Sequence, residues 1–167
     1  MEKLVNLLKN KNKTISSMES CTGGLFASEI TNIDGSSEIF KLGLVTYCNE
    51  YKEYFGVSKE LINEYTVYSN EISQEMAKSV SNISKSDFSI GITGMLGVQD
   101  PNNENDNINT VYITIYEKQN NIYHNYKIQA LGNTRIEKKL YIINYIKEKL
   151  YEICKWKIAR IWNLHKK

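Results

Sequence analysis

The chain has 167 residues, enough for one domain with a full hydrophobic core and too few for two ordinary domains. Its 41% hydrophobic and 24% charged residues are typical of a soluble globular protein and argue against a disordered or membrane-embedded chain. The formal net charge of +2 is close to neutral, so the composition does not indicate a nucleic-acid-binding surface.

The N-terminal segment and the cysteines indicate a cytoplasmic protein. No apolar run approaches the roughly 18 residues of a membrane span, and "MEKLVNLLKNKNK" lacks the continuous apolar region of a signal peptide. Cys21, Cys48 and Cys154 are odd in number and lack the close pairing of a zinc site or a thioredoxin-like motif. We therefore expect free thiols, no metal or cofactor, and no contact with a membrane.

Helices and strands alternate in the first half of the predicted chain. In order, we expect a helix over 2–11, a strand over 13–19, a helix over 25–33, a turn over 33–40 and a strand over 40–47. The helix over 25–33 opens at Cys21 to Gly24. The strand over 40–47 is continuously apolar, which is typical of a buried strand.

Helices predominate in the next part of the chain, which ends in a hairpin and a long helix. The expected segments are helices over 48–55, 58–65 and 69–84, a strand over 86–94, an exposed loop over 95–109 containing Pro101, and hairpin strands over 110–117 and 121–131. The helices over 58–65 and 69–84 each open with a serine followed by a glutamate, and Ser69 is a candidate helix cap. The longest helix, over 133–153, carries an apolar stripe made of Ile136, Leu140, Ile143, Ile146 and Leu150.

Strands mixed with helices, together with one hairpin, predict a single three-layer α/β/α domain with a mixed sheet over residues 1–153. Residues 154–167 form a basic tail with two tryptophans. This tail is a candidate contact for nucleic acid or a membrane surface. We favour a basic helical extension or a subunit contact instead, because such tails are more commonly structural.

Three strand ends share one pattern, in which an apolar run is followed by small or hydroxyl residues and a helix start. In open α/β sheets, ligands bind outside the carboxyl ends of the strands. If the three strands are parallel neighbours, five side chains converge there: Ser20, Thr22, Tyr47, Lys52 and Thr93.

Such a group supports acyl transfer. A serine hydroxyl becomes nucleophilic when a base removes its proton, and a lysine in a dry pocket has a pKa low enough to act as that base. Tyr47 would donate or relay a proton, and backbone amides at a helix opened by glycines would stabilise an oxyanion.

Each of these residues also has a purely structural interpretation. Gly23 and Gly24 suit a tight turn, and "CTGG" is neither a Rossmann nor a Walker motif. Lys52 alone would be a solvated helix residue. Cys21 has no histidine linked to it in the sequence, which argues against a Cys-His nucleophile. Arg135 opposes the helix dipole at a helix start, which is compatible with either an anion contact or simple exposure.

The segments "ESCTGGLFASEIT", "GSSEIF", "GLVTYCNEYKEYFGVSKELI", "YSNEISQEMA" and "GITG" resemble, in this order, the C-terminal domain of the competence/damage-inducible protein CinA. The resemblance covers residues 3–150. That family includes stand-alone nicotinamide-nucleotide amidases. The resemblance implies hydrolysis of the carboxamide of nicotinamide mononucleotide to nicotinate mononucleotide and ammonia, in a homo-oligomer without a cofactor.

The resemblance also implies functional residues. A Ser-Lys pair would be Ser37 with Lys52, and Tyr47 and Ser20 complete the catalytic set. The sequence leaves open whether Ser20 or Ser37 is the nucleophile. The implied substrate-binding residues are Thr22, Gly23, Gly24, Asn49, Thr93, Gly94 and Arg135.

This sequence departs from the family pattern in four places. Cys48 replaces a serine, "GMLGVQDP" has fewer glycines than the family loop, Asn109 replaces a glycine, and "GNTR" aligns Arg135 only with an insertion. These departures keep a second hypothesis open, a nucleotide-binding or partner-binding module with weakened catalysis. The family's larger members carry an additional N-terminal domain, for which we expect no room in this chain.

Overall fold

The computed structural model describes residues 1–97 and 108–164, and the side chains of residues 156–164 are outside that description. The helices are α1 Glu2–Asn10, α2 Leu25–Thr31, α3 Asn49–Tyr54, α4 Lys59–Tyr65, α5 Asn70–Ser84 and α6 Arg135–Leu164, with short 3-10 turns η1 Ser36–Glu38 and η2 Lys118–Asn120. The strands are β1 Ile15–Glu19, β2 Phe40–Val45, β3 Phe88–Gly94, β4 Thr110–Glu117 and β5 Ile122–Gln129.

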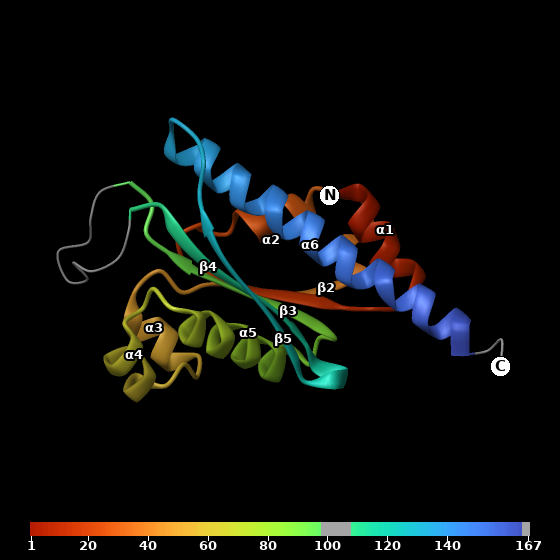
Figure 1. Cartoon of the computed structure of the whole chain (residues 1–167), viewed down its shortest axis with the longest axis horizontal. Helices are drawn as coiled ribbons and strands as arrows, with labels where there is room; N and C mark the ends of the chain where they lie inside the picture. The colour runs from red at the N-terminus through yellow and green to blue at the C-terminus, as the bar shows by residue number, and fades with distance from the viewer. Residues whose placement is uncertain (98–107, 165–167) are drawn as a thin grey trace.

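The strands form one mixed sheet in the order β2-β1-β3-β4-β5. Strand β1 pairs in parallel with β2 and β3, and the β3-β4 and β4-β5 pairs are antiparallel. Helices α1, α2 and α6 cover one face of this sheet, and α3, α4 and α5 lie on the other (Figure 1). The predicted three-layer α/β/α domain with a mixed sheet is confirmed.

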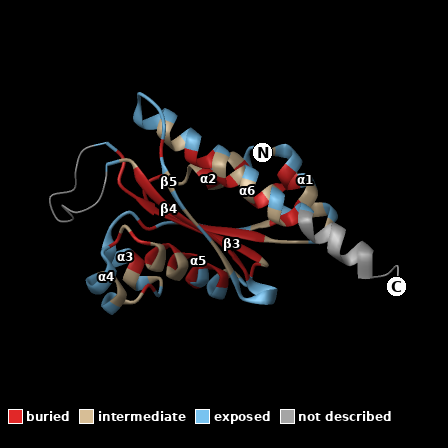
Figure 2. Cartoon of the chain, in the orientation of Figure 1, coloured by how far each residue is buried: buried red, intermediate tan, exposed pale blue. Residues whose placement is uncertain are grey.

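Each helical layer packs on its own apolar cluster. The larger cluster lies between the sheet and α1, α2 and α6, and a smaller one joins Met18 of β1 to Ile72, Met76 and Val80 of α5. Every residue of β1, β3 and β4 is buried, so the middle of the sheet is the dry centre of the molecule (Figure 2). The ends of these strands can therefore place polar side chains in a water-poor environment.

Helix capping follows the sequence closely. The hydroxyl of Ser58 accepts a hydrogen bond from Leu61 N–H, and that of Ser69 accepts one from Ile72 N–H. These bonds satisfy backbone donors that an N-terminal helical turn leaves without an intrahelical partner. The prediction of Ser69 as a helix cap is confirmed, and Ser58 caps α4 in the same way.

Two expectations about burial are wrong. Strand β2 is an edge strand whose side chains alternate between half-buried and exposed, because only β1 pairs with it. On α6, Ile143, Ile146 and Leu150 are buried, whereas Ile136 and Leu140 are 54% and 41% exposed. Packing of α6 on the sheet starts about two turns into the helix, so the apolar stripe is longer than the surface it covers.

The predicted exposed loop over 95–109 is wrong at its start. Met95 and Leu96 are each only 4% exposed, and Met95 N–H donates to Thr110 O, which prolongs the β3-β4 pairing. Pro101 lies outside the described residues.

The last helix continues past the predicted end of the domain at residue 153. The tail's tryptophans and most of its basic side chains lie outside the described side chains, so the division of the chain at residue 153 stays a prediction. None of the helices over the described residues has the length and apolarity to cross a membrane.

Candidate active site

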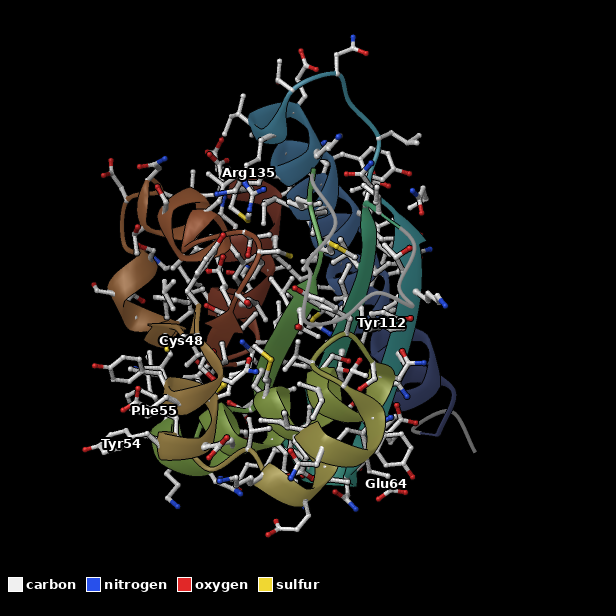
Figure 3. All side chains as sticks on the ribbon, turned by 90° about the vertical axis from the view of Figure 1, so that its left-hand side faces the viewer. Cys48, Tyr54, Phe55, Glu64, Tyr112 and Arg135 are labelled. Carbon is white, nitrogen blue, oxygen red and sulfur yellow. The ribbon has the colours of Figure 1, made fainter. Side chains whose placement is uncertain are left out.

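The carboxyl ends of β2, β1 and β3 lie side by side, as the sequence predicts, and Figure 3 views the molecule from this end. Both parallel ladders extend one residue past β1: Thr46 N–H donates to Glu19 O, and Ser20 N–H donates to Ile92 O, at 2.8 and 3.0 Å. These bonds fix the residues that follow each strand as firmly as the strands themselves.

Ser20 and Lys52 meet in this region. Lys52 Nζ lies 3.5 Å from Ser20 Oγ and donates to Thr46 O at 2.9 Å. The serine is 7% exposed and the lysine 2% exposed, so the contact is shielded from water. The sequence prediction that Lys52 joins Ser20 is confirmed, and the alternative of a solvated Lys52 is wrong.

Burial lowers the pKa of Lys52 below its usual value of 10.5, because desolvation disfavours the ammonium form. Among the described residues, no salt bridge to a carboxylate opposes this effect. Burial has the opposite effect on the neighbouring thiol and raises the pKa of Cys21 to about 12. Burial therefore makes the amine of Lys52 easier to deprotonate than a solvated lysine. It disfavours a thiolate at Cys21, which argues against Cys21 as a nucleophile.

Glu19 organises the loop that carries Ser20. Its carboxylate is completely buried and accepts hydrogen bonds from the Thr22 hydroxyl and from Gly24, Phe26 and Ala27 N–H, at 2.7 to 3.1 Å. A carboxylate at the start of α2 satisfies helix donors and favours the positive end of the helix dipole. The loop is thus fixed from inside the protein.

The glycine amides are already engaged. Gly24 N–H donates to Glu19, and Gly23 N–H donates to Ser20 O at 3.0 Å. The expectation that these two amides stabilise an oxyanion is therefore wrong for this conformation. Both glycines have positive φ, 65° and 89°, so their structural role is the turn itself.

Tyr47 and Arg135 meet across the site entrance. Arg135 donates from one guanidinium nitrogen to Tyr47 Oη at 3.1 Å and from another to Leu96 O. Tyr47 is 64% exposed. Lys139, one turn along α6, places Nζ 3.1 Å from the position that a Cβ on Gly23 would take. The start of α6 therefore brings two cations next to the serine loop, which the sequence anticipated only for Arg135.

The remaining predicted residues have mixed environments. The hydroxyl of Thr93 is buried and donates to Val67 O at 2.7 Å. Gly94 packs so closely on β4 that an added Cβ would lie 2.6 Å from Thr110 O. Asn49 is exposed at the start of α3. Thr93 and Gly94 are thus enclosed in the interior of the protein, whereas Asn49 faces solvent.

Ser37 is not brought to Lys52 within this chain. It is exposed in η1, beside Glu38, which forms a salt bridge with Lys9. That turn precedes β2, whereas Lys52 follows it, and an extended strand of this length separates its ends by roughly 20 Å. The pair of Ser37 with Lys52 that the resemblance implies is therefore absent from the folded chain.

Sequence reasoning assigned no role to two residues of the site, Glu19 and Thr46. Glu19 was visible as an acidic residue in the "ESCTGG" motif, but its interior contacts depend on the path of α2. Thr46 occupies the hydroxyl position of the strand-end pattern in "LVTY" and is completely buried. The pattern shared by the three strand ends could have identified Thr46 from the sequence.

The three cysteines are free, with Cys21 and Cys154 buried and Cys48 exposed. Free thiols were the sequence prediction, which is confirmed. Cys48 lies at the start of α3, at the left of the view in Figure 3.

Comparisons with known proteins agree with the fold. The model of the CinA C-terminal domain family matches residues 1–145. A CinA-like protein of Prochlorococcus marinus is 34% identical over 142 residues, which cover 84% of this chain and 33% of the relative. A CinA-like protein of Flavobacterium psychrophilum is 44% identical over 115 residues, which cover 67% and 27%. The chain spans about a third or less of the length of these curated relatives.

Solved structures share the architecture. A CinA superfamily protein from Klebsiella pneumoniae superposes with a TM-score of 0.85 at 18% identity, covering 92% of this chain and 94% of that one. The competence/damage inducible protein CihA from Agrobacterium tumefaciens gives 0.80 at 26% identity, covering 90% and 93%. The first of these likenesses concerns the fold alone.

Proposed function

Since the chain belongs to the CinA C-terminal domain family, we propose that it is an amidohydrolase that converts nicotinamide mononucleotide to nicotinate mononucleotide and ammonia. The names of its relatives state no activity, so the proposal rests on the motif resemblance and the site. The observation that carries it is the buried amine of Lys52, 3.5 Å from the hydroxyl of Ser20.

In the proposed reaction, Ser20 is the nucleophile and Lys52 the base. Neutral Lys52 takes the proton of Ser20 Oγ while that oxygen forms a bond to the carboxamide carbon. Lys52 then returns the proton to the leaving nitrogen, which departs as ammonia and leaves an acyl-serine. Lys52 next removes a proton from water, whose oxygen attacks the acyl carbon. The bond between that carbon and Ser20 Oγ then breaks, Lys52 gives the proton to Oγ, and the nicotinate product is released.

The cations at the start of α6 support a nucleotide substrate. Arg135 and Lys139 form no salt bridge with a carboxylate among the described residues. A guanidinium binds phosphate through two parallel hydrogen bonds, and an ammonium adds a point charge. We assign the substrate phosphate to these two side chains and the pyridine carboxamide to the side of Ser20.

The reaction needs no metal or cofactor, because nucleophile, base and cationic groups are all side chains of the chain. The described residues contain no cluster of three or more metal-ligating side chains. We also propose that the protein acts in the cytoplasm and as a homo-oligomer, as the sequence predicts.

A second candidate is a nucleotide-binding module with little turnover. It is favoured by the engagement of Gly23 and Gly24 N–H, which removes two expected oxyanion donors. This candidate predicts saturable binding of nicotinamide mononucleotide by calorimetry with no product after hours.

The test is incubation of the purified chain with nicotinamide mononucleotide, with and without a chelator, followed by identification of the products. The amidase proposal predicts equal amounts of ammonia and nicotinate mononucleotide, unaffected by the chelator. Binding without product would instead support the module, and loss of activity with the chelator would contradict the metal-independent mechanism.

A further inference from the structure

The hydroxyl of Thr46 is buried without a hydrogen-bond partner. Among the described residues, buried polar side-chain atoms in this condition are Thr46 Oγ1, Asn70 Oδ1 and His124 Nε2. Thr46 is completely buried, and unlike the other two it adjoins the Ser20-Lys52 contact, since its carbonyl accepts from Lys52 Nζ. Most buried hydroxyls are paired, so an unpaired one inside a site is a candidate to bind a ligand group.

Thr46 stands in a row of hydroxyls across the three parallel strands. In register, Glu19 of β1 is opposite Val45 of β2 and Ile92 of β3. One residue further along, Ser20 lies between Thr46 and Thr93. Neighbouring strands are about 4.8 Å apart, so the three side chains are adjacent at the same edge of the sheet.

All three hydroxyl residues are on the sheet face that α3 and α5 cover. Side chains alternate along a strand, and Leu44 and Met18 both pack against the α5 cluster. Thr46 and Ser20, each two residues later, therefore have the same orientation. Lys52 reaches Ser20 from α3, on this side of the sheet.

Of the three hydroxyls in this row, those of Ser20 and Thr93 are engaged within the protein. Ser20 Oγ contacts Lys52 Nζ, and Thr93 Oγ1 donates to Val67 O. The hydroxyl of Thr46 thus stays available as a donor next to the nucleophile. Gly23 and Gly24 N–H, the donors that the sequence suggested, already have acceptors.

We propose that Thr46 Oγ1 donates a hydrogen bond to the carbonyl oxygen of the substrate amide and stabilises the oxyanion that forms when Ser20 attacks. The assignment rests on the proposed amidase function. As the bond from Ser20 Oγ to the carbon forms, the π pair of the carbonyl moves onto its oxygen and the serine proton moves to Lys52. Thr46 keeps its proton throughout and makes no covalent bond.

The test compares Thr46→Val, which has nearly the same shape without the hydroxyl, with Thr46→Ser, which keeps it. Removing one oxyanion donor lowers kcat by about 100-fold or more, so we expect that loss in Thr46→Val, with KM changed less than about threefold. Thr46→Ser should retain most of the activity. The melting temperature of Thr46→Val should equal or exceed that of the wild type, since an unpaired buried hydroxyl is replaced by a methyl group.

Thr114→Val is the matched control. Thr114 is equally buried, but its hydroxyl bonds Ser73 and Asn125 at 2.7 and 2.9 Å. It lies on β4, two strands across the sheet from β1 and in register with Met18. This variant should melt at a lower temperature and keep the wild-type kcat.

Wild-type kcat in Thr46→Val would overturn the assignment of Thr46 while leaving the amidase function intact. A Thr46→Val protein that is destabilised as much as Thr114→Val would also overturn it, because the hydroxyl would then be structural. A wild-type chain that releases no ammonia would contradict the proposed function itself, and with it the role of Thr46.

Discussion

Lys52 Nζ lies 3.5 Å from Ser20 Oγ, although 31 residues separate the two positions in the sequence, and both side chains are almost completely withdrawn from solvent. The contact depends on two hydrogen bonds of the backbone of Thr46. Its N–H donates to Glu19 O, which ties the end of β2 to β1, and its carbonyl accepts a hydrogen bond from Lys52 Nζ. Ser20 and Lys52, the proposed nucleophile and base, are thus positioned by the end of the sheet.

The activity should rise with pH as Lys52 loses its proton. Burial lowers the pKa of Lys52, so the neutral amine that acts as base predominates above a midpoint below 10.5. A plot of log kcat/KM against pH should therefore show an acid limb with that midpoint. Lys52→Met should lower kcat by about 100-fold or more and remove the acid limb of the pH profile. The control Lys59→Met, at an exposed position of α4, should leave both kcat and the pH profile unchanged. An unchanged pH profile in Lys52→Met would contradict the role of the amine.

Glu19→Gln should destabilise the fold. The amide would turn an NH2 group towards backbone N–H groups that now donate to the carboxylate, which leaves buried donors unsatisfied at a cost of about 1–3 kcal/mol or more. Urea unfolding gives the free energy of unfolding of this variant and of the wild type. Glu60→Gln, at an exposed site beside Ser58, is the control and should unfold like the wild type. Equal stability of Glu19→Gln and wild type would show that the carboxylate does not hold the loop.

Arg135→Gln should weaken substrate binding more than catalysis. The proposed phosphate contact would be the same in ground and transition states, so we expect KM to rise about tenfold while kcat changes less than threefold. Lys147→Gln, three turns further along α6, should leave both constants unchanged. A fall in kcat at constant KM would place Arg135 in the chemical step instead.

The order of elements was predictable from the sequence because its local signals agree. Serines precede α4 and α5 and cap them, and glycines open α2. The burial of β2 was not predictable, since an apolar run does not reveal whether a strand has one neighbour or two. Likewise, an apolar stripe on a helix does not show where its contact with the sheet begins. The exposed Ile136 and Leu140 of α6 therefore resembled core residues.

The candidate site was predictable only in part. The shared pattern of the strand ends brings Ser20, Lys52 and Thr93 to one edge of the sheet. Ser37 precedes β2 and Lys52 follows it, so the direction of the strand places the two residues at opposite ends of β2. The family motifs alone do not reveal this separation. Glu19 accepts hydrogen bonds from backbone N–H groups of α2, and the carbonyl of Thr46 accepts one from the side chain of Lys52. Those contacts exist only once α2, α3 and the strand ends are in place.

The most direct measurement is the rate of ammonia release from nicotinamide mononucleotide by Ser20→Ala and Ser37→Ala, each compared with the wild type and checked for folding by its melting temperature. Ser20 contacts Lys52, whereas Ser37 is exposed beyond the start of β2. We predict that Ser20→Ala loses at least about 1,000-fold in kcat and that Ser37→Ala keeps nearly all of it. Full activity in Ser20→Ala, or its loss in a folded Ser37→Ala protein only, would contradict the assignment of Ser20 as the nucleophile.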